Sequence, residues 1–300
     1  MNKEIKIFQS KVWSDYEMLD TGGGEKLERF GAYTFVRPLE DAFWKKSLDQ
    51  KIWDKADGRF VSSKEGGKAG WRLGKNVPKD WVMSFKDIKF KASPTPFRHL
   101  SFFPEQASHW EFIAEKISGV GHQGISGVQH PKFLNLFAYT GVASLVALSA
   151  GAEVTHVDAS KQSVELAKEN QKLSNLEDRP MRVIVDDVIK FLEREVKRGN
   201  KYDAVIMDPP KHGRGPKGEV WKLEEKLPKL LDLVSRVLSP EPLFVILTSY
   251  STDSSALTLG YALENALKEK GGSVESGEMC IKETSSGKMI SLAHTAVWQK

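Results

Sequence analysis

From residue 97 onward, short apolar runs alternate with amphipathic segments, and this alternation constrains the fold more than any other feature of the chain. The apolar runs are continuous, which is typical of strands buried on both faces of a sheet. The expected strands are residues 133–137, 154–157, 182–185, 204–207, 243–248, 274–283 and 292–298. The expected helices are residues 109–117, 142–149, 188–197, 222–238 and 257–269, with a further one that begins at Ser160 or Gln162 and ends at Leu173. This order predicts an α/β fold with a Rossmann-like, seven-stranded sheet, mostly parallel and ending in an antiparallel pair.

The N-terminal part follows a different pattern, in which short strand-like runs are separated by turn signals. The expected strands are residues 13–20, 27–30, 32–36, 81–85 and 88–92. The triple glycine at residues 22–24 predicts antiparallel hairpins, and residues 57–80 are expected to form an exposed loop. Ser93-Pro94-Thr95-Pro96 marks a linker. We therefore expect a β-rich substrate-binding module in residues 1–96 and the α/β domain in residues 97–300.

Charge and composition limit the partners of the chain. Residues 1–97 hold 19 lysines and arginines against 14 aspartates and glutamates, with five of the eight tryptophans. Basic and aromatic side chains suit an RNA surface, although an excess of this size is also typical of an ordinary solvated surface. No apolar run approaches the roughly 20 residues that span a bilayer, and no Cys/His group has zinc-site spacing. We expect a cytoplasmic protein without membrane segment or metal, and the sequence indicates no particular oligomeric state.

The tetrapeptide Asp208-Pro209-Pro210-Lys211 directly follows the apolar run at residues 204–207. A central strand cannot continue through two prolines, because each lacks the backbone donor and fixes its own φ. The Asp208 carboxylate is therefore expected at the carboxyl end of a buried strand, the edge at which open α/β sheets bind ligands. The alternative interpretation is a strand that ends in an ordinary turn.

A second strand end carries a turn suited to a ligand. The turn is formed by Phe137, Ala138, Tyr139, Thr140 and Gly141. Its glycine lets a ligand approach the backbone, and the helix that follows offers unpaired amide donors. Because the turn contains one glycine, it lacks the GxGxxG pattern of dinucleotide binding and suits a cofactor without phosphates.

Acidic residues close the next two strands. Asp158 ends the second strand, where a carboxylate is placed to accept hydrogen bonds from the two hydroxyls of a ribose. Asp186 and Asp187 end the third, where an acid can accept from an adenine amino group. Asp187 is favoured, because it directly precedes the helix. Together with Asp208, these strand ends predict one crevice for a nucleoside-type cofactor.

The segments LNLFAYTG, THVDAS, VDDVIKFL and KYDAVIMDPPK, in this order and spacing, resemble class I S-adenosylmethionine-dependent methyltransferases. Over about residues 97–250 they look most similar to the group that contains the 23S ribosomal-RNA cytosine-C5 methyltransferases. Residues 15–44 also resemble the small β-rich module that precedes the catalytic domain in that group. The resemblance implies a methyltransferase sheet, S-adenosyl-L-methionine as cofactor and RNA as partner.

The resemblance also implies roles for individual residues. The implied cofactor-binding residues are Gln106, Phe137, Ala138, Tyr139, Thr140, Gly141, Asp158, Ala159, Ser160, Asp186, Asp187 and Asp208. Gln106 belongs to the segment at residues 101–106, which is implied to close over the methionine end of the cofactor. The implied catalytic residues are Asp208, Pro209, Pro210 and Lys211.

The chain departs from that group in two respects. It has no room for the group's N-terminal RNA-binding PUA domain, and Tyr250 stands where the catalytic cysteine is expected. Methylation at cytosine C5 needs a cysteine nucleophile, and a phenol with a pKa of about 10 is a poor substitute. Cys280 lies in the final strand pair, where we expect it to be buried. The sequence therefore leaves open whether carbon or nitrogen accepts the methyl group.

The segment from Lys211 to Trp221 combines glycines and basic side chains. One interpretation is a substrate lid that contacts phosphates, with Trp221 stacked on a base. The other is a surface loop whose tryptophan packs on the following helix. For transfer to an amine, Asp208 and the Pro209 carbonyl would hold the amino group while its lone pair attacks.

These observations predict an S-adenosylmethionine-dependent methyltransferase that acts on RNA, with ribosomal RNA favoured. Three alternatives remain. The enzyme acts on a protein or a small molecule, or the chain is an RNA-binding module that keeps the fold without turnover. The third, a nicotinamide oxidoreductase, is disfavoured by the absence of GxGxxG.

Overall fold

The computed structural model describes residues 4–10, 13–62, 69–121, 130–250 and 254–300. The chain forms two compact units. Unit 1 comprises Met1–Phe8, Ser108–Met279 and Ser291–Lys300, and unit 2 comprises Gln9–Ala107 and Cys280–Ile290. Within the described ranges, no helix is long and apolar enough to cross a membrane.

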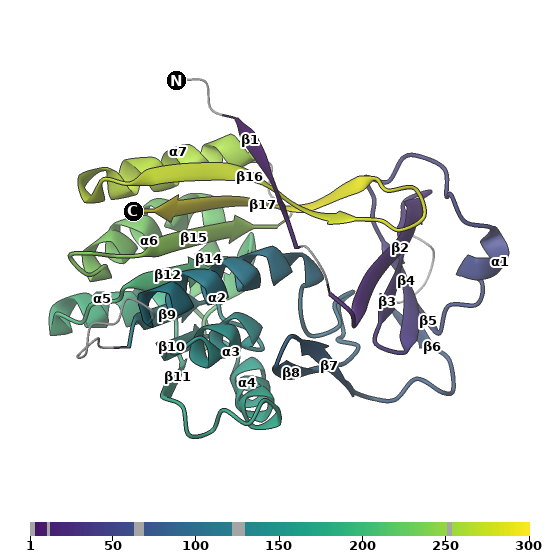
Figure 1. Cartoon of the computed structure of the whole chain (residues 1–300), viewed down its shortest axis with the longest axis horizontal. Coiled ribbons are helices and arrows are strands. Elements are labelled where there is room, and N and C mark those ends of the chain that lie inside the picture. Colours follow the sequence, from purple (N-terminus) through teal and green to yellow (C-terminus); the bar gives the residue numbers. More distant parts are fainter. Residues whose placement is uncertain (1–3, 11–12, 63–68, 122–129, 251–253) are drawn as a thin grey trace. The chain divides into compact units, whose positions relative to one another are not determined.

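Unit 1 is built on an eight-stranded sheet with the order β1-β16-β17-β15-β12-β9-β10-β11 (Figure 1). Its strands are β1 (Ile5–Gln9), β9 (Lys132–Leu136), β10 (Glu153–Asp158), β11 (Met181–Val185), β12 (Ala204–Met207), β15 (Phe244–Ser249), β16 (Ser273–Lys282) and β17 (Met289–Gln299). The strands from β15 to β11 in this order pair in parallel, and β17 runs antiparallel to β15. The carboxyl ends of the parallel strands therefore share one edge, with β9 between β12 and β10.

Helices connect these strands. They are α2 (Ala107–Gly121), α3 (Val142–Ser149), α4 (Lys161–Leu173), α5 (Val188–Arg198), α6 (Leu223–Val237), α7 (Ala256–Leu267) and the short 3₁₀ helix η3 (Lys268–Lys270). Side chains cap the starts of three of these helices: Ser160 for α4, Asp187 for α5 and Ser255 for α7. Apolar faces of α5, α6 and α7 pack with strand residues such as Leu134 and Val205 in one buried core. The predicted α/β class is confirmed.

The sheet has one strand more than the seven predicted. The additional strand is β1, at the edge beside β16, in a part of the sequence that we assigned to the β-rich module. Its Ile5 and Ile7 side chains are 45% and 54% exposed. An edge strand with exposed faces carries no continuous apolar run, so its sequence lacks the signal that marks the buried strands.

Unit 2 contains a five-stranded sheet with the order β2-β3-β4-β5-β6 and a separate hairpin, β7–β8. Its strands are β2 (Tyr16–Gly22), β3 (Glu25–Phe30), β4 (Tyr33–Pro38), β5 (Gly58–Val61), β6 (Gly70–Leu73), β7 (Trp81–Phe85) and β8 (Ile88–Ala92). Two short helices, α1 (Gln50–Trp53) and the 3₁₀ helix η2 (Pro104–Gln106), complete the unit. The hairpins predicted from the glycine-rich turns are confirmed. The exposed loop predicted at residues 57–80 is wrong in part, because β5 and β6 form there.

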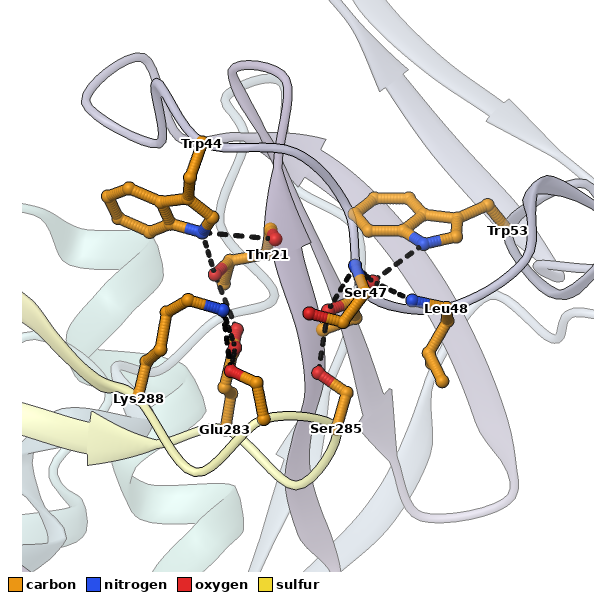
Figure 2. A network of polar contacts seen from close by, with 10 residues as sticks. Thr21, Trp44, Ser47, Leu48, Trp53, Glu283, Ser285 and Lys288 are labelled. Atoms are coloured by element: carbon orange, nitrogen blue, oxygen red, sulfur yellow. Dashed lines mark hydrogen bonds and ion pairs between the residues drawn. The ribbon is translucent and has the colours of Figure 1, made fainter.

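The tip of the β16–β17 hairpin belongs to unit 2, where polar contacts tie it to β2 (Figure 2). The buried Asp20 carboxylate accepts hydrogen bonds from the Ser285 hydroxyl at 2.6 Å and from the Trp53 indole at 3.1 Å. It also accepts from two backbone amides, and these donors lower its pKa against the opposing effect of burial. Thr21 donates to the Glu283 carboxylate. Residues more than 250 positions apart in sequence therefore form one part of unit 2.

Side chains from β2, β3 and β4 of the same sheet form a buried charged cluster. The Glu28 carboxylate, which is fully buried, accepts two hydrogen bonds from the Arg37 guanidinium at 2.6 Å and one from the Tyr16 hydroxyl at 2.9 Å. Paired in this way, the carboxylate retains a low pKa in spite of burial.

The predicted division at residue 96 does not follow the compact units, since unit 2 continues to Ala107 and includes Cys280–Ile290.

Candidate active site

The turn that follows β9 has an unusual backbone. Phe137 and Tyr139 have φ angles of 56° and 49°, and Gly141 has 86°. The left-handed region costs a residue with a Cβ atom roughly 1–2 kcal/mol, so the surrounding structure must hold Phe137 and Tyr139 there. Two backbone hydrogen bonds contribute, from Ala138 to the Val157 carbonyl at 3.0 Å and from Gly141 to the Ala138 carbonyl at 3.1 Å. Strain of this kind is concentrated at functional sites.

Asp158, at the end of β10, supports this turn directly. Its Oδ2 accepts from the Tyr139 amide and its Oδ1 from the Ser160 amide, both at 2.8 Å. Burial raises the pKa of Asp158, while the two amide donors oppose that shift. Each carboxylate oxygen retains a further lone pair. Asp158 can therefore hold the turn and the start of α4 while accepting from a ligand. Ala159 lies half-buried between these contacts, and Ser160 is exposed.

Buried polar side chains lie behind the turn. The Asn135 amide donates to the Ser144 hydroxyl at 3.0 Å, and that hydroxyl lies 3.0 Å from Nδ1 of His156. Burial lowers the pKa of His156 to about 4, so its ring is neutral at pH 7. The Asn170 amide donates to the Thr140 carbonyl at 2.9 Å. The turn is therefore hydrogen-bonded to two neighbouring elements, to β10 through Val157 and Asp158 and to α4 through Asn170.

Sequence reasoning missed these supporting residues. Asn135 and His156 interrupt apolar strands with buried polar groups, and that interruption was the available signal. His156, together with Ala167 of α4, also explains why residue 141 is glycine. A Cβ atom at Gly141 would lie 2.9 Å from the Ala167 Cβ and 3.3 Å from the His156 Cε1.

The two acids after β11 have different contacts. Asp187 caps α5, because its Oδ1 accepts from the Lys190 amide at 3.0 Å. Asp186 accepts from its neighbour's amide at 2.9 Å and pairs with the Arg194 guanidinium. The helix cap anticipated for Asp187 is present. Both side chains are half-buried at the same sheet edge as Asp158.

The Asp-Pro-Pro-Lys loop begins where β12 ends at Met207. The Asp208 side chain is half-buried, Pro209 is buried and Pro210 is exposed. Residue 207 lies in register with Leu136, and the Asp208 amide lies 3.4 Å from the Leu136 carbonyl. The acid is therefore one strand away from the turn that begins at Phe137.

The segment after this loop forms a small hairpin. Its strands are β13 (His212–Arg214) and β14 (Val220–Lys222). Trp221 is buried, and its indole Nε1 donates to the Pro210 carbonyl at 2.6 Å. The Glu219 carboxylate forms an ion pair with Lys190 of α5 at 2.5 Å. Because its ring is enclosed by the protein, Trp221 does not stack on a base in this conformation, and the structural interpretation of this residue is favoured.

The end of β15 contains Thr248 and Ser249, both buried. Tyr250 follows, half-buried, at the position where the resemblance implies a cysteine. Cys280 lies in β16 and is buried, as expected. Gln106 lies in η2 and belongs to unit 2, whereas the turn and the four strand ends belong to unit 1.

Comparison with known proteins agrees with this arrangement. A family model described as "Conserved hypothetical protein 95" matches residues 109–259, about half of the chain. The crystal structure of the SAM-dependent methyltransferase from Agrobacterium tumefaciens is 38% identical, with a TM-score of 0.91 over 100% of this chain and 96% of that one. A candidate SAM-dependent methyltransferase from Streptococcus mutans has a TM-score of 0.72 over 96% of this chain and 76% of its own. At 16% identity, it supports the fold alone.

A curated relative matches over a shorter stretch. Ribosomal RNA large subunit methyltransferase I of Escherichia coli O139:H28 is 38% identical over 85 residues. The match covers 28% of this chain and 22% of the length of that relative. Fold, strand-end residues and these similarities lead to one assignment. The chain belongs to the class I S-adenosylmethionine-dependent methyltransferases, in the family described as conserved hypothetical protein 95.

Proposed function

We propose that this protein transfers a methyl group from S-adenosyl-L-methionine to RNA, with ribosomal RNA as the favoured substrate. The observation that carries the proposal is the pair of adjacent strand ends in unit 1. One is the strained turn of Phe137, Tyr139 and Gly141, which Asp158 holds, and the other is the Asp208-Pro209-Pro210 loop. A cofactor turn beside an acceptor loop is the arrangement that group transfer between two bound molecules requires.

The chemistry of the turn fits a nucleoside cofactor. Gly141 has no room for a Cβ atom, so glycine lets the turn pack closely against Ala167 and His156 at the start of α3. Asp158 retains lone pairs for ribose hydroxyls, and the acids after β11 can accept from an adenine amino group. We assign cofactor binding to Gln106, Phe137, Ala138, Tyr139, Thr140, Gly141, Asp158, Ala159, Ser160, Asp186, Asp187 and Asp208.

S-adenosylmethionine supplies a methyl group on a sulfonium, which needs no further activation to react with a nucleophile. The protein's part is therefore to hold and orient the acceptor. The Asp208 carboxylate and the Pro209 carbonyl accept hydrogen bonds from an amino group and direct its lone pair. Pro210 and Lys211 complete the proposed catalytic loop. The two prolines limit the backbone freedom of this loop, which keeps the acceptor oriented.

Two observations support RNA as the substrate. The Escherichia coli relative is named for large-subunit ribosomal RNA. His212, Arg214 and Lys217 are exposed on the hairpin that follows the acceptor loop, where they suit contacts with phosphates. We assign substrate binding to the β-rich unit as well, because it carries most of the tryptophans and the basic excess. The proposed location is the cytoplasm.

The test is transfer of radiolabelled methyl groups into RNA, protein and small-molecule fractions prepared from cells that lack the gene. We expect label in the RNA fraction, followed by identification of the methylated nucleoside. Label confined to the protein or small-molecule fraction would contradict RNA as the substrate.

A separate experiment tests the cofactor: S-adenosylhomocysteine should raise the melting temperature of the protein. Stabilisation by NADH instead, without any by S-adenosylhomocysteine, would contradict the methyltransferase assignment.

A further inference from the structure

The two prolines leave the Asp208-Pro209-Pro210-Lys211 loop with few backbone donors. Neither proline has an N–H group, and the Asp208 amide contact to Leu136 is long at 3.4 Å. Support comes from residues that follow in the chain. The indole of Trp221 donates to the Pro210 carbonyl at 2.6 Å, and the Leu223 amide donates to the Lys211 carbonyl at 3.0 Å. The segment at residues 221–223 therefore contributes two hydrogen bonds that orient the loop.

The same tryptophan contacts the cofactor turn. Its ring lies against the Phe137 ring with centroids 4.8 Å apart and planes at 62°, the edge-to-face arrangement that aromatic rings prefer. Phe137 is the first left-handed residue of the turn and packs against the core. Trp221 is 5% exposed. One buried side chain thus contacts both the acceptor loop and the turn.

The hairpin is shaped to bring Trp221 to this position. Gly213 is paired with Trp221 in the β13–β14 register. A Cβ atom at Gly213 would lie 3.2 Å from the Pro210 Cγ and 3.7 Å from the Trp221 Cβ, so glycine permits the close approach. Next to Trp221 in the chain, Val220 is exposed, and the Glu219 carboxylate is paired with Lys190. The Trp221 hydrogen bond to Pro210 and the Glu219–Lys190 ion pair therefore hold the hairpin in place.

We propose that Trp221 is a positioning residue for methyl transfer, which holds the Pro210 carbonyl and thereby orients Asp208 and the Pro209 carbonyl toward the acceptor. This inference rests on the proposed function. Among the described residues, no donor contacts the Pro209 carbonyl, so it is available to an acceptor group. In-line transfer tolerates little misalignment between acceptor and methyl group, and a displacement of 1 Å can cost on the order of 100-fold in rate.

The test is Trp221→Phe, which keeps an aromatic ring against Phe137 and removes the N–H donor. With in vitro transcribed large-subunit ribosomal RNA as substrate, we expect kcat to fall by about tenfold. The KM for S-adenosylmethionine and the affinity for S-adenosylhomocysteine should stay within about twofold, because the contact with Phe137 remains. Trp221→Ala should lower kcat further and also weaken S-adenosylhomocysteine binding.

Trp298→Phe is the matched control. Trp298 is also buried, and its indole donates to the Gly271 carbonyl at 2.8 Å, but β17 is not part of the catalytic loop or the turn. Both variants lose one indole hydrogen bond, so melting temperatures should fall by similar amounts, while kcat should fall only in Trp221→Phe. If kcat stays unchanged in both variants, or falls equally in both, the inference is overturned. A wild-type enzyme without methyl transfer to RNA would overturn the proposed function, and the inference would fall with it.

Discussion

The cofactor turn and the acceptor loop lie on neighbouring strands, yet they are held in opposite ways. The turn after β9 has a strained backbone, which is stabilised by two hydrogen bonds: Asp158 accepts from the Tyr139 amide, and Asn170 donates to the Thr140 carbonyl. The loop after β12 is stiffened by two prolines, and its carbonyls are held by Trp221 and Leu223. The turn is thus held by neighbouring elements, whereas the loop is restricted by its two prolines and is also held by the hairpin that directly follows it. Mutations should separate the two regions by their effects on cofactor binding and on transfer.

Asp208→Asn should produce the largest effect and should act on transfer alone. The substitution removes the negative charge that orients the acceptor, and we expect kcat to fall by roughly 10²–10³-fold. The cofactor turn is unchanged, so S-adenosylhomocysteine affinity measured by calorimetry should fall by less than about fivefold. Asp203→Asn is the control at the opposite end of the same strand, where an amide oxygen can still accept from the Lys132 amide. If kcat falls equally in both variants, Asp208 has no special role.

Gly141→Ala should act on the cofactor side. The φ of 86° and the short contacts to Ala167 and His156 would force the turn to move. We expect a loss of about 2–3 kcal/mol in the free energy of unfolding and roughly 100-fold weaker S-adenosylhomocysteine binding. Gly151→Ala is the control, because Gly151 has a φ of 103° and no atom within 4 Å of the added Cβ. It should cost stability of about 1 kcal/mol and leave binding intact. Equal binding in both variants would contradict close packing as the reason for glycine at 141.

Asp158 allows a test by pH. Burial raises its pKa, so the carboxylate protonates at a higher pH than an ordinary aspartate, and S-adenosylhomocysteine affinity should fall as the pH is lowered toward 4. The raised pKa affects folding stability in the opposite direction, because the folded state binds the proton more tightly than the unfolded state. Its contribution to stability is present below the unfolded pKa and is lost as pH rises through the folded pKa.

Asp158→Asn should abolish this pH dependence of affinity. The amide can replace one of the two acceptors but presents a donor to the other backbone N–H. We expect affinity about tenfold weaker at pH 7 from the loss of the charged acceptor. Calorimetric titrations between pH 4 and pH 8 provide the measurement. A variant that retains the wild-type pH profile would assign the dependence to another group.

The smallest effect is expected at the hairpin surface. Replacing Arg214 and Lys217 by glutamine should raise the KM for RNA a few-fold. For single-stranded RNA, each lost phosphate contact should reduce the slope of log affinity against log salt by about 0.7. Lys168→Gln with Lys197→Gln removes the same charge from α4 and α5 and is the control. An unchanged salt slope in the hairpin variant would place the RNA contacts elsewhere. S-adenosylhomocysteine affinity should not change in either variant.

Much of unit 1 could be predicted because its signals are local. Continuous apolar runs marked the buried strands, and the Asp187 side chain marked the start of α5. Edge strand β1 was missed, since an exposed strand needs no apolar run. The strands β5 and β6 were missed because each is short and lies in a segment rich in glycine and lysine.

The sequence by itself determined that Asp158, Asp187 and Asp208 stand at the ends of strands, because apolar runs and prolines mark where those strands stop. It also determined that a glycine ends the turn at 141. Only the tertiary structure decided that Phe137 and Tyr139 are left-handed, that His156 is buried and neutral behind them, and that Trp221 holds Pro210. The physical reason is that a local pattern specifies secondary structure. A hydrogen bond between distant segments depends on how those segments pack, which no single stretch of sequence encodes.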